Sequence, residues 1–385
     1  MQIGIACYPT YGGSGVVATE LGKALAERGH VIHFITYERP VRLDYFTENI
    51  FYHQVSPPTY PLFDFVPYES ALTSRLVDVA LHHELDLLHV HYAIPHASAA
   101  YLAQQILREK GREVPCITTL HGTDITLVGR EEAYAPIVEF SLNHSNGVTA
   151  VSEYLKQVTQ EYFNLKQPVH VIPNFLDMSR FRRLDSKHVR NRLAGRDEKI
   201  LVHASNFRKV KRVNDVLDVY LKVREVLPSR LMLIGDGPER SPLEKRVREL
   251  GLTHDVLFLG NQDRIEDILP LGDLFLLPSE SETFGLAALE AMASGLPVVS
   301  TLSGGLPEVI EDGKSGRLLP VGDVEGMSRA AIEILSDPDL FRAYANAAAE
   351  RAQEFCQENI VPLYESLYQE AVSQLNSAQR SAAHA

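Results

Sequence analysis

The chain contains 385 residues, of which 45% are hydrophobic and 23% are charged. This composition is typical of a globular protein, and at about 100–200 residues per domain the length predicts two domains. Lys and Arg total 37 against 50 Asp and Glu, which gives a net charge of −13. A balance this acidic argues against a protein that coats nucleic acid or an anionic membrane, because contact with either polyanion is repulsive. A small anionic ligand is compatible with this net charge, provided that positive charge is concentrated at the site that binds it.

The cysteines and the hydropathy pattern predict a soluble cytoplasmic protein. Cys7, Cys116 and Cys356 lie far apart, without CxxC or metal-ligand spacing, so a reducing compartment is the simplest setting. No basic leader precedes the strand pattern at Met1–Cys7, and no stretch approaches 18 consecutive apolar residues. The sequence leaves the oligomeric state open, and a homo-oligomer is compatible with it.

The first half of the chain alternates short apolar strands with amphipathic helices. A strand, a helix and a strand joined by short links form a βαβ unit, which implies parallel pairing and a right-handed crossover. The expected strands are Ile3–Cys7, Val31–Thr36, Leu87–His91, Cys116–Leu120, Gly147–Val151 and Val169–Ile172. The expected helices are Val16–Arg28, Pro95–Lys110 and Pro136–Asn143.

The alternation stops at a polar and basic linker, Pro173–Arg196, which includes a short helix, and then begins again. The expected strands of the second half are Lys199–Ala204, Leu231–Ile234, Val256–Leu259, Leu274–Leu277, Val298–Ser300 and Arg317–Leu319. The expected helices are Arg212–Val226, Pro242–Leu250, Asp263–Leu269, Leu286–Ala293 and an amphipathic last helix at Val361–Leu375. The pattern predicts an α/β protein with two Rossmann-like, doubly wound parallel sheets. Ligands of such sheets bind at the carboxyl ends of the strands, so a cleft between the halves is the default site.

A glycine cluster follows the first strand. Gly13, Gly15 and Ala18 match the dinucleotide fingerprint, and Glu38 follows the second strand where a ribose-binding acid would lie, so a nicotinamide dehydrogenase is a competitor. Residues 8–11 lengthen the loop before the first glycine, however. A longer aromatic loop suits a helix N-terminus that faces a small anion or a sugar. The remaining alternative is that the glycines only form a turn.

A run of cations follows the first strand of the second half. Arg208, Lys209, Lys211 and Arg212 are four cations within five residues. Such runs are usually solvated surface. This one lies at a strand-to-helix corner, where parallel sheets bind ligands, so a diphosphate is the expected partner.

Two carboxylates flank a predicted helix N-terminus in the segment from Pro278 to Glu290. Glu282 lies in a polar loop and Glu290 within the helix that begins near Gly285. Amides suit phosphate, and carboxylates accept hydrogen bonds from sugar hydroxyls. The alternative is a capping box, Ser279-x-x-Glu282, with Glu290 as a solvated helix residue.

The histidines supply no obvious metal site. His121 follows a strand in the segment 119–124, at the end where ligands bind. His89 and His91 share a strand face, but no third ligand with metal spacing is evident. Four histidines are predicted to be structural: His82, His83, His89 and His96. The D-x-D at Asp337–Asp339 is predicted to be a helix N-cap.

Taken together, these residues resemble a retaining GT-B glycosyltransferase of family four over nearly the whole chain. The E-x7-E pair Glu282 and Glu290 with Phe284-Gly285-Leu286 is the signature, and residues 235–238 and 172–174 are also typical. Three longer stretches resemble the branch of this family that serves bacillithiol biosynthesis: residues 7–22, 90–96 and 118–124.

The resemblance implies a fold, a reaction and a set of ligands. It implies two Rossmann-like domains facing a central cleft: an acceptor-binding domain at residues 1–168, with a terminal helix at about 361–376 packing back on it, and a nucleotide-sugar domain at residues 169–360. It implies UDP-N-acetylglucosamine as the donor, L-malate as the acceptor and a retained α linkage, with no cofactor and no metal. The alternatives are another small acceptor or a UDP-sugar epimerase of the same fold.

The resemblance also implies roles for individual residues. Glu290 would hold the uridine ribose, Glu282 the donor sugar, and His121 would line the anomeric centre. The predicted catalytic residues are His121, Arg208, Lys211 and Glu282. The predicted donor-binding residues are Gly13, Asn206, Gly235, Asn261, Thr283, Phe284, Gly285, Leu286 and Glu290. The predicted acceptor-binding residues are Ser14, Gly15, Tyr92 and Thr119. Asn206 stands where many family members have Arg, so which cation meets which phosphate stays open.

Overall fold

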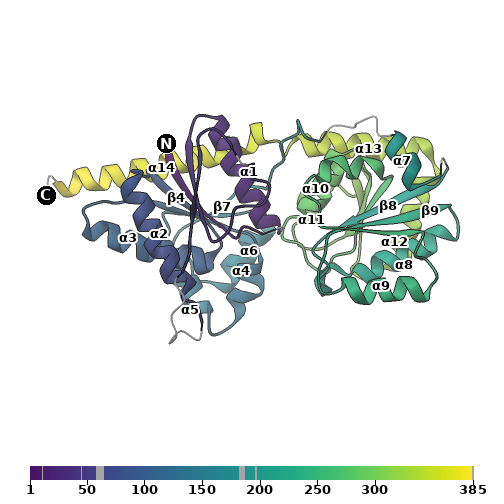
Figure 1. Cartoon of the computed structure of the whole chain (residues 1–385), viewed down its shortest axis with the longest axis horizontal. Coiled ribbons are helices and arrows are strands. Elements are labelled where there is room, and N and C mark those ends of the chain that lie inside the picture. The colour runs from purple at the N-terminus through teal and green to yellow at the C-terminus, as the bar shows by residue number, and fades with distance from the viewer. Residues whose placement is uncertain (11, 45, 58–64, 182–186, 196, 384–385) are drawn as a thin grey trace. The chain divides into compact units, whose positions relative to one another are not determined.

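The computed structural model describes all residues except 11, 45, 58–64, 182–186, 196 and 384–385 (Figure 1). Tyr11 of the glycine loop and Arg196 of the expected linker therefore lie outside the described residues. The chain divides into two compact units, Met1–Asn174 with Gln357–Ala385, and Phe175–Cys356. No helix among the described residues is both long and apolar enough to cross a bilayer.

The first unit contains a parallel sheet, whose described strands follow the order β3-β2-β1-β4-β5-β6-β7. The strands are β1 Gln2–Ala6, β2 Val31–Thr36, β3 Ile50–Gln54, β4 Leu87–His91, β5 Cys116–Leu120, β6 Gly147–Ala150 and β7 Val169–Val171. The helices are α1 Gly13–Glu27, α2 Tyr68–His82, α3 Ser98–Glu109, α4 Thr123–Thr126, α5 Ala135–His144, α6 Glu153–Tyr162 and α14 Gln357–Ala383. A π turn at Ala93–Ala97 and a 3-10 turn at Val128–Arg130 complete it.

The second unit repeats the architecture with the strand order β10-β9-β8-β11-β12-β13. The strands are β8 Lys199–Ala204, β9 Ser229–Ile234, β10 Val256–Gly260, β11 Leu274–Leu277, β12 Val298–Thr301 and β13 Gly316–Leu319. The helices are α7 Lys187–Leu193, α8 Val213–Arg224, α9 Arg240–Glu249, α10 Leu286–Ala293, α11 Leu306–Val309, α12 Val324–Ser336 and α13 Pro338–Gln353. The described 3-10 turns are Lys209–Lys211, Ile265–Asp267 and Leu269–Leu271.

These two parallel sheets confirm the predicted fold class, and the differences have local causes. The helix expected at Asp263–Leu269 is instead two 3-10 turns, because Pro270 has no backbone N–H to bond back to Glu266. The strand β7 pairs with β6, so the first unit runs to Asn174 instead of ending at residue 168. The helices α2, α6 and α12 and the edge strand β3 were not anticipated. The three helices have buried apolar residues at helical spacing, whereas β3 has no buried residue.

The terminal helix α14 belongs to the first unit, although the whole second unit separates it in sequence from β7. Tyr368 on α14 lies with its hydroxyl 2.7 Å from Nδ1 of His89 on β4. Glu365 accepts a hydrogen bond of 2.6 Å from Arg28 at the end of α1. Both contacts explain why this helix crosses back instead of extending the second unit.

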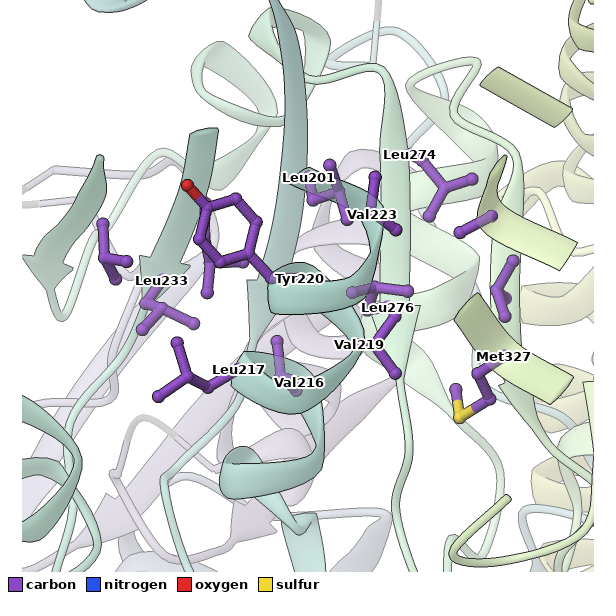
Figure 2. Close-up of a cluster of buried hydrophobic side chains, with 14 of the residues drawn as sticks. Leu201, Val216, Leu217, Val219, Tyr220, Val223, Leu233, Leu274, Leu276 and Met327 are labelled. Carbon is purple, nitrogen blue, oxygen red and sulfur yellow. The ribbon is translucent and has the colours of Figure 1, made fainter. Parts of the chain in front are cut away.

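The core of the second unit lies between its sheet and α8 (Figure 2). Val216, Val219, Tyr220 and Val223 recur at helical spacing and face the strands. Fully burying one such side chain contributes about 1.5–3 kcal/mol. The labelled strand residues of the cluster are Leu201, Leu233, Leu274 and Leu276, and Leu217 of α8 and Met327 of α12 complete the labelled set.

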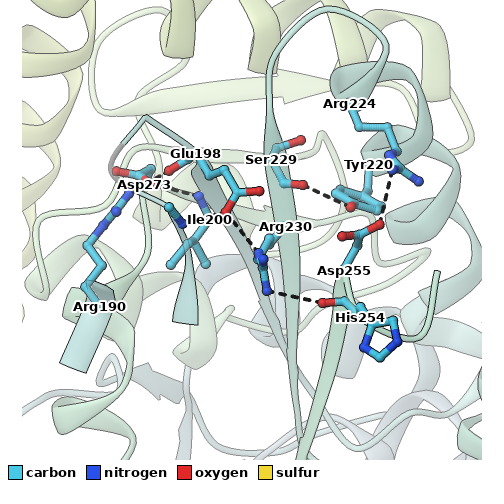
Figure 3. A network of polar contacts seen from close by, with 11 residues as sticks. Arg190, Glu198, Ile200, Tyr220, Arg224, Ser229, Arg230, His254, Asp255 and Asp273 are labelled. Carbon is cyan, nitrogen blue, oxygen red and sulfur yellow. Dashed lines mark hydrogen bonds and ion pairs between the residues drawn. The ribbon is translucent and has the colours of Figure 1, made fainter. Parts of the chain in front are cut away.

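The amino edge of the same sheet is held by ion pairs (Figure 3). Asp273, just before β11, accepts hydrogen bonds from the Ile200 amide at 2.7 Å and from Arg190 at 2.6 Å. Arg230 at the start of β9 pairs with Glu198 at 3.0 Å. These contacts secure the amino ends of the strands, and the predicted site residues lie at the opposite, carboxyl edge.

Candidate active site

Two predicted site residues of the second unit are in direct contact. Lys211, in the 3-10 turn after β8, donates to Oε1 of Glu282, in the loop after β11, at 2.6 Å. The hydroxyl of Ser279 donates to the same oxygen at 2.8 Å. Both side chains of the ion pair are largely buried, with 19% and 13% exposed. The capping-box alternative is wrong, because Ser279 bonds to Glu282 and the helix α10 begins later, with Gly285 as its N-cap.

The main chain at Glu282 is fixed by two glycines that sequence reasoning missed. A Cβ at Gly304 would lie 1.8 Å from the Glu282 carbonyl oxygen, and its φ of +57° also favours glycine. The Gly305 amide donates to that same carbonyl oxygen at 2.8 Å. The signal in the sequence was the Gly-Gly pair after β12, which is the neighbouring strand in the sheet.

Glycine also permits the close approach of two other strand-end loops. A Cβ at Gly235 would lie 1.9 Å from the Ser205 carbonyl oxygen, and one at Gly237 would lie 2.2 Å from that of Asn206. The Gly235 amide bonds to the Gly260 carbonyl at 2.8 Å, which places the exposed Asn261 next along the same edge. The loops after β8, β9 and β10 therefore converge, and they include the predicted donor-binding residues Asn206, Gly235 and Asn261.

Asn206 has a feature of a ligand-binding residue. Its side-chain oxygen is buried and has no hydrogen-bond partner among the described residues. A buried polar atom without a partner costs about 1–3 kcal/mol. Phe207 beside it is fully buried and has a φ of +29°, a strained conformation of the kind that clusters at functional sites.

The helix α10 presents its N-terminus and one buried acid. Gly285 adopts a φ of +101° at the N-cap, and no side chain caps the helix. Glu290 is only 5% exposed, so the alternative of a solvated helix residue is wrong. Glu290 is therefore a buried acid on a helix whose other buried residues are apolar, and it lies one turn from the N-terminus. Thr283, Phe284 and Leu286, the other predicted residues of this segment, flank the same N-cap.

The cation run divides into paired and exposed members. Lys211 is paired with Glu282, and Arg212 pairs with Asp215 at 2.7 Å. Arg208 and Lys209 are exposed, and no ion pair joins them to an acidic residue in the described part of the chain. Buried His203 adds no charge, because burial lowers its pKa to about 4. Its Nδ1–H donates to the Leu276 carbonyl, so its Nε2 accepts from Ser205 at 2.8 Å.

In the first unit, the predicted residues lie in an aromatic cluster at the ends of β1, β4 and β5. His121 lies 2.8 Å from His91 through ring nitrogens and stacks with Tyr92 at 5.6 Å between centroids. Tyr8 contacts Tyr92 edge-on at 5.2 Å, and it contacts His96 at 4.7 Å. Burial, with a smaller contribution from His96, lowers the pKa of His121 to about 3, so its imidazole is neutral near pH 7.

The glycine loop contributes Ser14 to this cluster. The hydroxyl of Ser14 lies 3.5 Å from that of Tyr92, whose φ of +88° is strained. A Cβ at Gly15 would lie 2.4 Å from the Thr10 carbonyl oxygen, whereas one at Gly13 would meet no atom within 4 Å. Turn formation and packing therefore explain Gly15 but not Gly13. The six residues between the end of β1 and the start of α1 at Gly13 include the long loop predicted.

Two histidine predictions have different outcomes. His89 is structural as predicted, since its nitrogens lie 2.7 Å from Thr119 and 2.7 Å from Tyr368. The contacts of Thr119 do not support its predicted acceptor role, because its buried hydroxyl bonds to His89 and to Thr149 at 2.6 Å. The prediction for His96 is wrong in one respect: both ring nitrogens are buried without a hydrogen-bond partner among the described residues.

Sequence reasoning also missed Asp124. Its carboxylate is buried and accepts hydrogen bonds from the amides of Ala93 at 3.1 Å and Gly122 at 2.9 Å. Burial raises its pKa to about 6, although these hydrogen bonds oppose the shift. Asp124 joins the loop after β4, which contains Tyr92, to the loop after β5, which contains His121. The sequence signal was the polar segment 119–124 itself.

The D-x-D at Asp337–Asp339 in the second unit is the predicted N-cap, since Asp337 accepts a hydrogen bond from the Asp339 amide at 2.9 Å.

Comparison with known families identifies this two-sheet protein as a glycosyltransferase. The glycosyltransferase family 4 model matches residues 11–180, and the model for glycosyl transferases group 1 matches residues 185–351. The chain belongs to this glycosyltransferase family.

A relative of particular interest is the N-acetyl-alpha-D-glucosaminyl L-malate synthase of Bacillus anthracis. It is 45% identical over 370 residues, which are 96% of each chain. An uncharacterized glycosyltransferase of Methanocaldococcus jannaschii is 25% identical and covers 94% of this chain and 96% of its own.

Solved structures share the GT-B fold. The sucrose-phosphate synthase of Thermosynechococcus elongatus aligns with a TM-score of 0.81 at 20% identity, over 98% of this chain and 100% of its own. Anabaena HepE in complex with UDP and glucose aligns with a TM-score of 0.77 at 22% identity, with the same coverage. Family membership overturns the nicotinamide dehydrogenase alternative, and the exposed Glu38 is not a ribose ligand of such an enzyme.

The close approach at Gly304 leads to a prediction with a matched control. Gly304→Ala should lower the stability of the second unit by about 1–3 kcal/mol more than Gly313→Ala, because both have positive φ but only Gly304 faces a backbone oxygen. Thermal unfolding of both variants measures the difference. Equal melting temperatures for the two variants would contradict the argument that backbone contact at Glu282 requires glycine here.

Proposed function

We propose that this glycosyltransferase moves N-acetylglucosamine from UDP-N-acetylglucosamine to the hydroxyl of L-malate, with retention of the α configuration. The observation that supports this most strongly is the 45% identity to the Bacillus anthracis malate synthase over 96% of both chains. The product would be N-acetyl-alpha-D-glucosaminyl L-malate, with UDP released, as the first step of bacillithiol biosynthesis.

In this proposal the second unit binds the donor. Glu290 accepts hydrogen bonds from the ribose hydroxyls, and the free amides at the start of α10 face the diphosphate. Exposed Arg208 adds positive charge, and Asn206 supplies a buried oxygen that has no partner among the described residues. The contact between Lys211 and Glu282 then rearranges, so that Lys211 meets a phosphate oxygen and Glu282 meets a sugar hydroxyl.

The reaction needs stabilisation of the leaving diphosphate more than it needs a protein base. The bond from the anomeric carbon to the phosphate oxygen breaks, and the malate hydroxyl forms its bond on the same face of the sugar. Its proton passes to the departing phosphate oxygen. Lys211, Arg208 and the α10 amides stabilise the charge that develops there, an effect of about 3–4 kcal/mol for one such donor. Neutral His121 lines the anomeric centre without adding charge.

Malate has two carboxylates, so the first unit must supply hydrogen-bond donors. Ser14, the Gly13–Gly15 amides and Tyr92 form the proposed acceptor site, and His96 adds two ring nitrogens without partners among the described residues. No metal and no cofactor enter this proposal. Three further points also stay predictions. They are a reducing cytoplasm, expected from the separated cysteines, the absence of nucleic-acid and membrane partners, and any homo-oligomer.

The reaction itself is the first test. The protein is supplied with UDP-N-acetylglucosamine, with and without L-malate, and the release of UDP is followed. We expect malate-dependent release of UDP and a single glycosylated product of α configuration by NMR. An absence of malate-dependent release would refute the proposal, and formation of the 2-epimer without an acceptor would favour a UDP-sugar epimerase.

The role of Glu290 leads to a second prediction. Glu290→Gln should weaken UDP binding by about 10–100-fold, because hydrogen bonds to a charged group contribute about 1.5–3 kcal/mol. Calorimetric titration with UDP measures the change, and circular dichroism verifies the fold. The control is Glu350→Gln, an exposed acid on α13, which should leave the affinity unaltered. Undiminished UDP affinity in Glu290→Gln would show that this acid does not contact the nucleotide.

The acceptor site leads to a third prediction. Tyr92→Phe and Ser14→Ala should each raise the KM for malate by about 10-fold, because each removes one hydroxyl donor to a charged carboxylate. The KM for the donor should change little. Tyr101→Phe on α3 is the control, since this tyrosine belongs to another part of the first unit and contacts Phe140. Unchanged malate KM and turnover in both variants would place the acceptor elsewhere.

A further inference from the structure

Three histidines of the first unit meet at the edge of its sheet, outside the proposed acceptor site. His33 lies on β2, His53 on β3 and His83 directly after α2. One possible ligand atom from each histidine lies within 4.8 Å of those of the other two. Among the described residues, no other group of three or more His, Cys, Asp or Glu side chains lies close enough together to hold one metal ion. The rings also contact one another, with centroids 5.2 Å apart for His33 and His53 and 4.6 Å apart for His33 and His83.

The sheet geometry brings these side chains to one face. The register pairs His33 with Phe51 and Ile35 with His53, so the alternation of side chains places all four on the same side. Ile35 packs in a core cluster with Leu72 and Leu76 of α2, which identifies the covering helix. His83, directly after that helix, therefore lies over the sheet face that carries the two strand histidines.

A neighbouring side chain determines which nitrogen of His33 is available. The Nε2 atom of His33 lies 3.0 Å from Oε1 of Gln2, an oxygen that only accepts, so the proton is on Nε2. The lone pair is then on Nδ1, which points toward Nε2 of His53 at 2.9 Å. A metal-binding histidine typically donates its other ring N–H to such a partner, which fixes the ring orientation. Gln2 is such a partner for His33, because its Oε1 accepts the hydrogen bond from Nε2–H.

The surroundings of His33 and His53 disfavour the charged forms of these two imidazoles. His33 is 1% exposed, and Phe51 stacks on its ring with centroids 5.2 Å apart. Burial, together with the neighbouring histidines, lowers the pKa of His33 and of His53 to about 4. Arg75 lowers the pKa of His53 and Asp78 raises it, so the charges of α2 that act on this ring oppose each other.

We propose that His33, His53 and His83 form a binding site for a divalent transition-metal ion, with Zn²⁺ as the best match. Three imidazoles suit Zn²⁺, Ni²⁺ and Cu²⁺ better than Mg²⁺ or Ca²⁺, which prefer oxygen ligands. Zn–N bonds of about 2.0–2.1 Å require nitrogens about 3.3–3.4 Å apart. The pair at 2.9 Å must separate slightly, and exposed His83 must move inward. A water molecule takes the fourth position.

The ion would be structural and not catalytic. It would tie the edge strand β3 and the end of α2 to β2, which lies two positions from β4 in the sheet. None of the three histidines belongs to the proposed donor or acceptor residues. A metal-independent sugar transfer is therefore compatible with a metal that stabilises the fold.

The test uses the full chain without a histidine tag, freed of metal with a chelator. Calorimetric titration with ZnCl₂ should give one site per chain, and Co²⁺ should produce the intense visible absorption of four-coordinate cobalt. His83→Ala removes an exposed ligand without disturbing the core and should weaken Zn²⁺ binding by at least about 100-fold. Gln2→Ala should weaken it by about 10–100-fold, as changes of an orienting partner do.

The adjacent histidine of the same helix is a matched control. His82 is exposed and bonds to Asp78 at 3.0 Å, so His82→Ala should bind Zn²⁺ as the unaltered chain does. Zn²⁺ should also raise the melting temperature of the unaltered chain and of His82→Ala, but not that of His83→Ala. Failure to bind Zn²⁺, Ni²⁺ or Co²⁺ in a one-to-one ratio, or equal loss in His82→Ala and His83→Ala, would overturn the site.

Discussion

Direct packing of backbone on backbone at the carboxyl edge of the second sheet is the constraint on which the candidate site depends. Gly304 approaches the Glu282 carbonyl so closely that no side chain fits, and Gly235 approaches Ser205 in the same way. These contacts leave the strand-end loops little freedom. Lys211 and Glu282, separated by 71 residues, therefore meet in an ion pair of 2.6 Å. In the proposed reaction this pair exchanges its mutual contact for contacts with a phosphate and a sugar hydroxyl.

The two units differ in the charge of the side chains at the carboxyl ends of their strands. The second unit gathers four cations within five residues, in a chain whose net charge is −13. Several other cations of that unit are occupied in ion pairs at the amino edge, such as Arg190 with Asp273. The first unit instead lines its strand ends with buried imidazoles, and burial lowers the pKa of His121 to about 3. In the proposed function these neutral rings and the neighbouring hydroxyl groups would bind the acceptor by hydrogen bonds.

Particular elements show where sequence reasoning succeeds and where it fails. The strands at Leu87–His91 and Cys116–Leu120 were predicted to the residue, although each includes two polar residues, because apolar and β-branched residues are concentrated in them. The edge strand β3 was missed, since Phe51 and Tyr52 are exposed and its pattern is weak. Glu290 was selected by its E-x7-E spacing from Glu282, but the sequence could not tell whether it is buried or solvated, and only the folded chain shows that it is buried. The histidine group escaped notice because register and helix packing, not spacing, bring its members together.

The family and the two parallel sheets could be predicted from the sequence, because local periodicity and short motifs carry that information. The donor-site residues stay predictions. The folded chain was needed to show that the Thr119 hydroxyl bonds to His89 and Thr149, and that Asp124 joins two loops. The folded chain also shows that His33, His53 and His83 lie close together. These are contacts between residues far apart along the chain. Their energies come from burial and from hydrogen bonds that form only when the sheets and helices have packed.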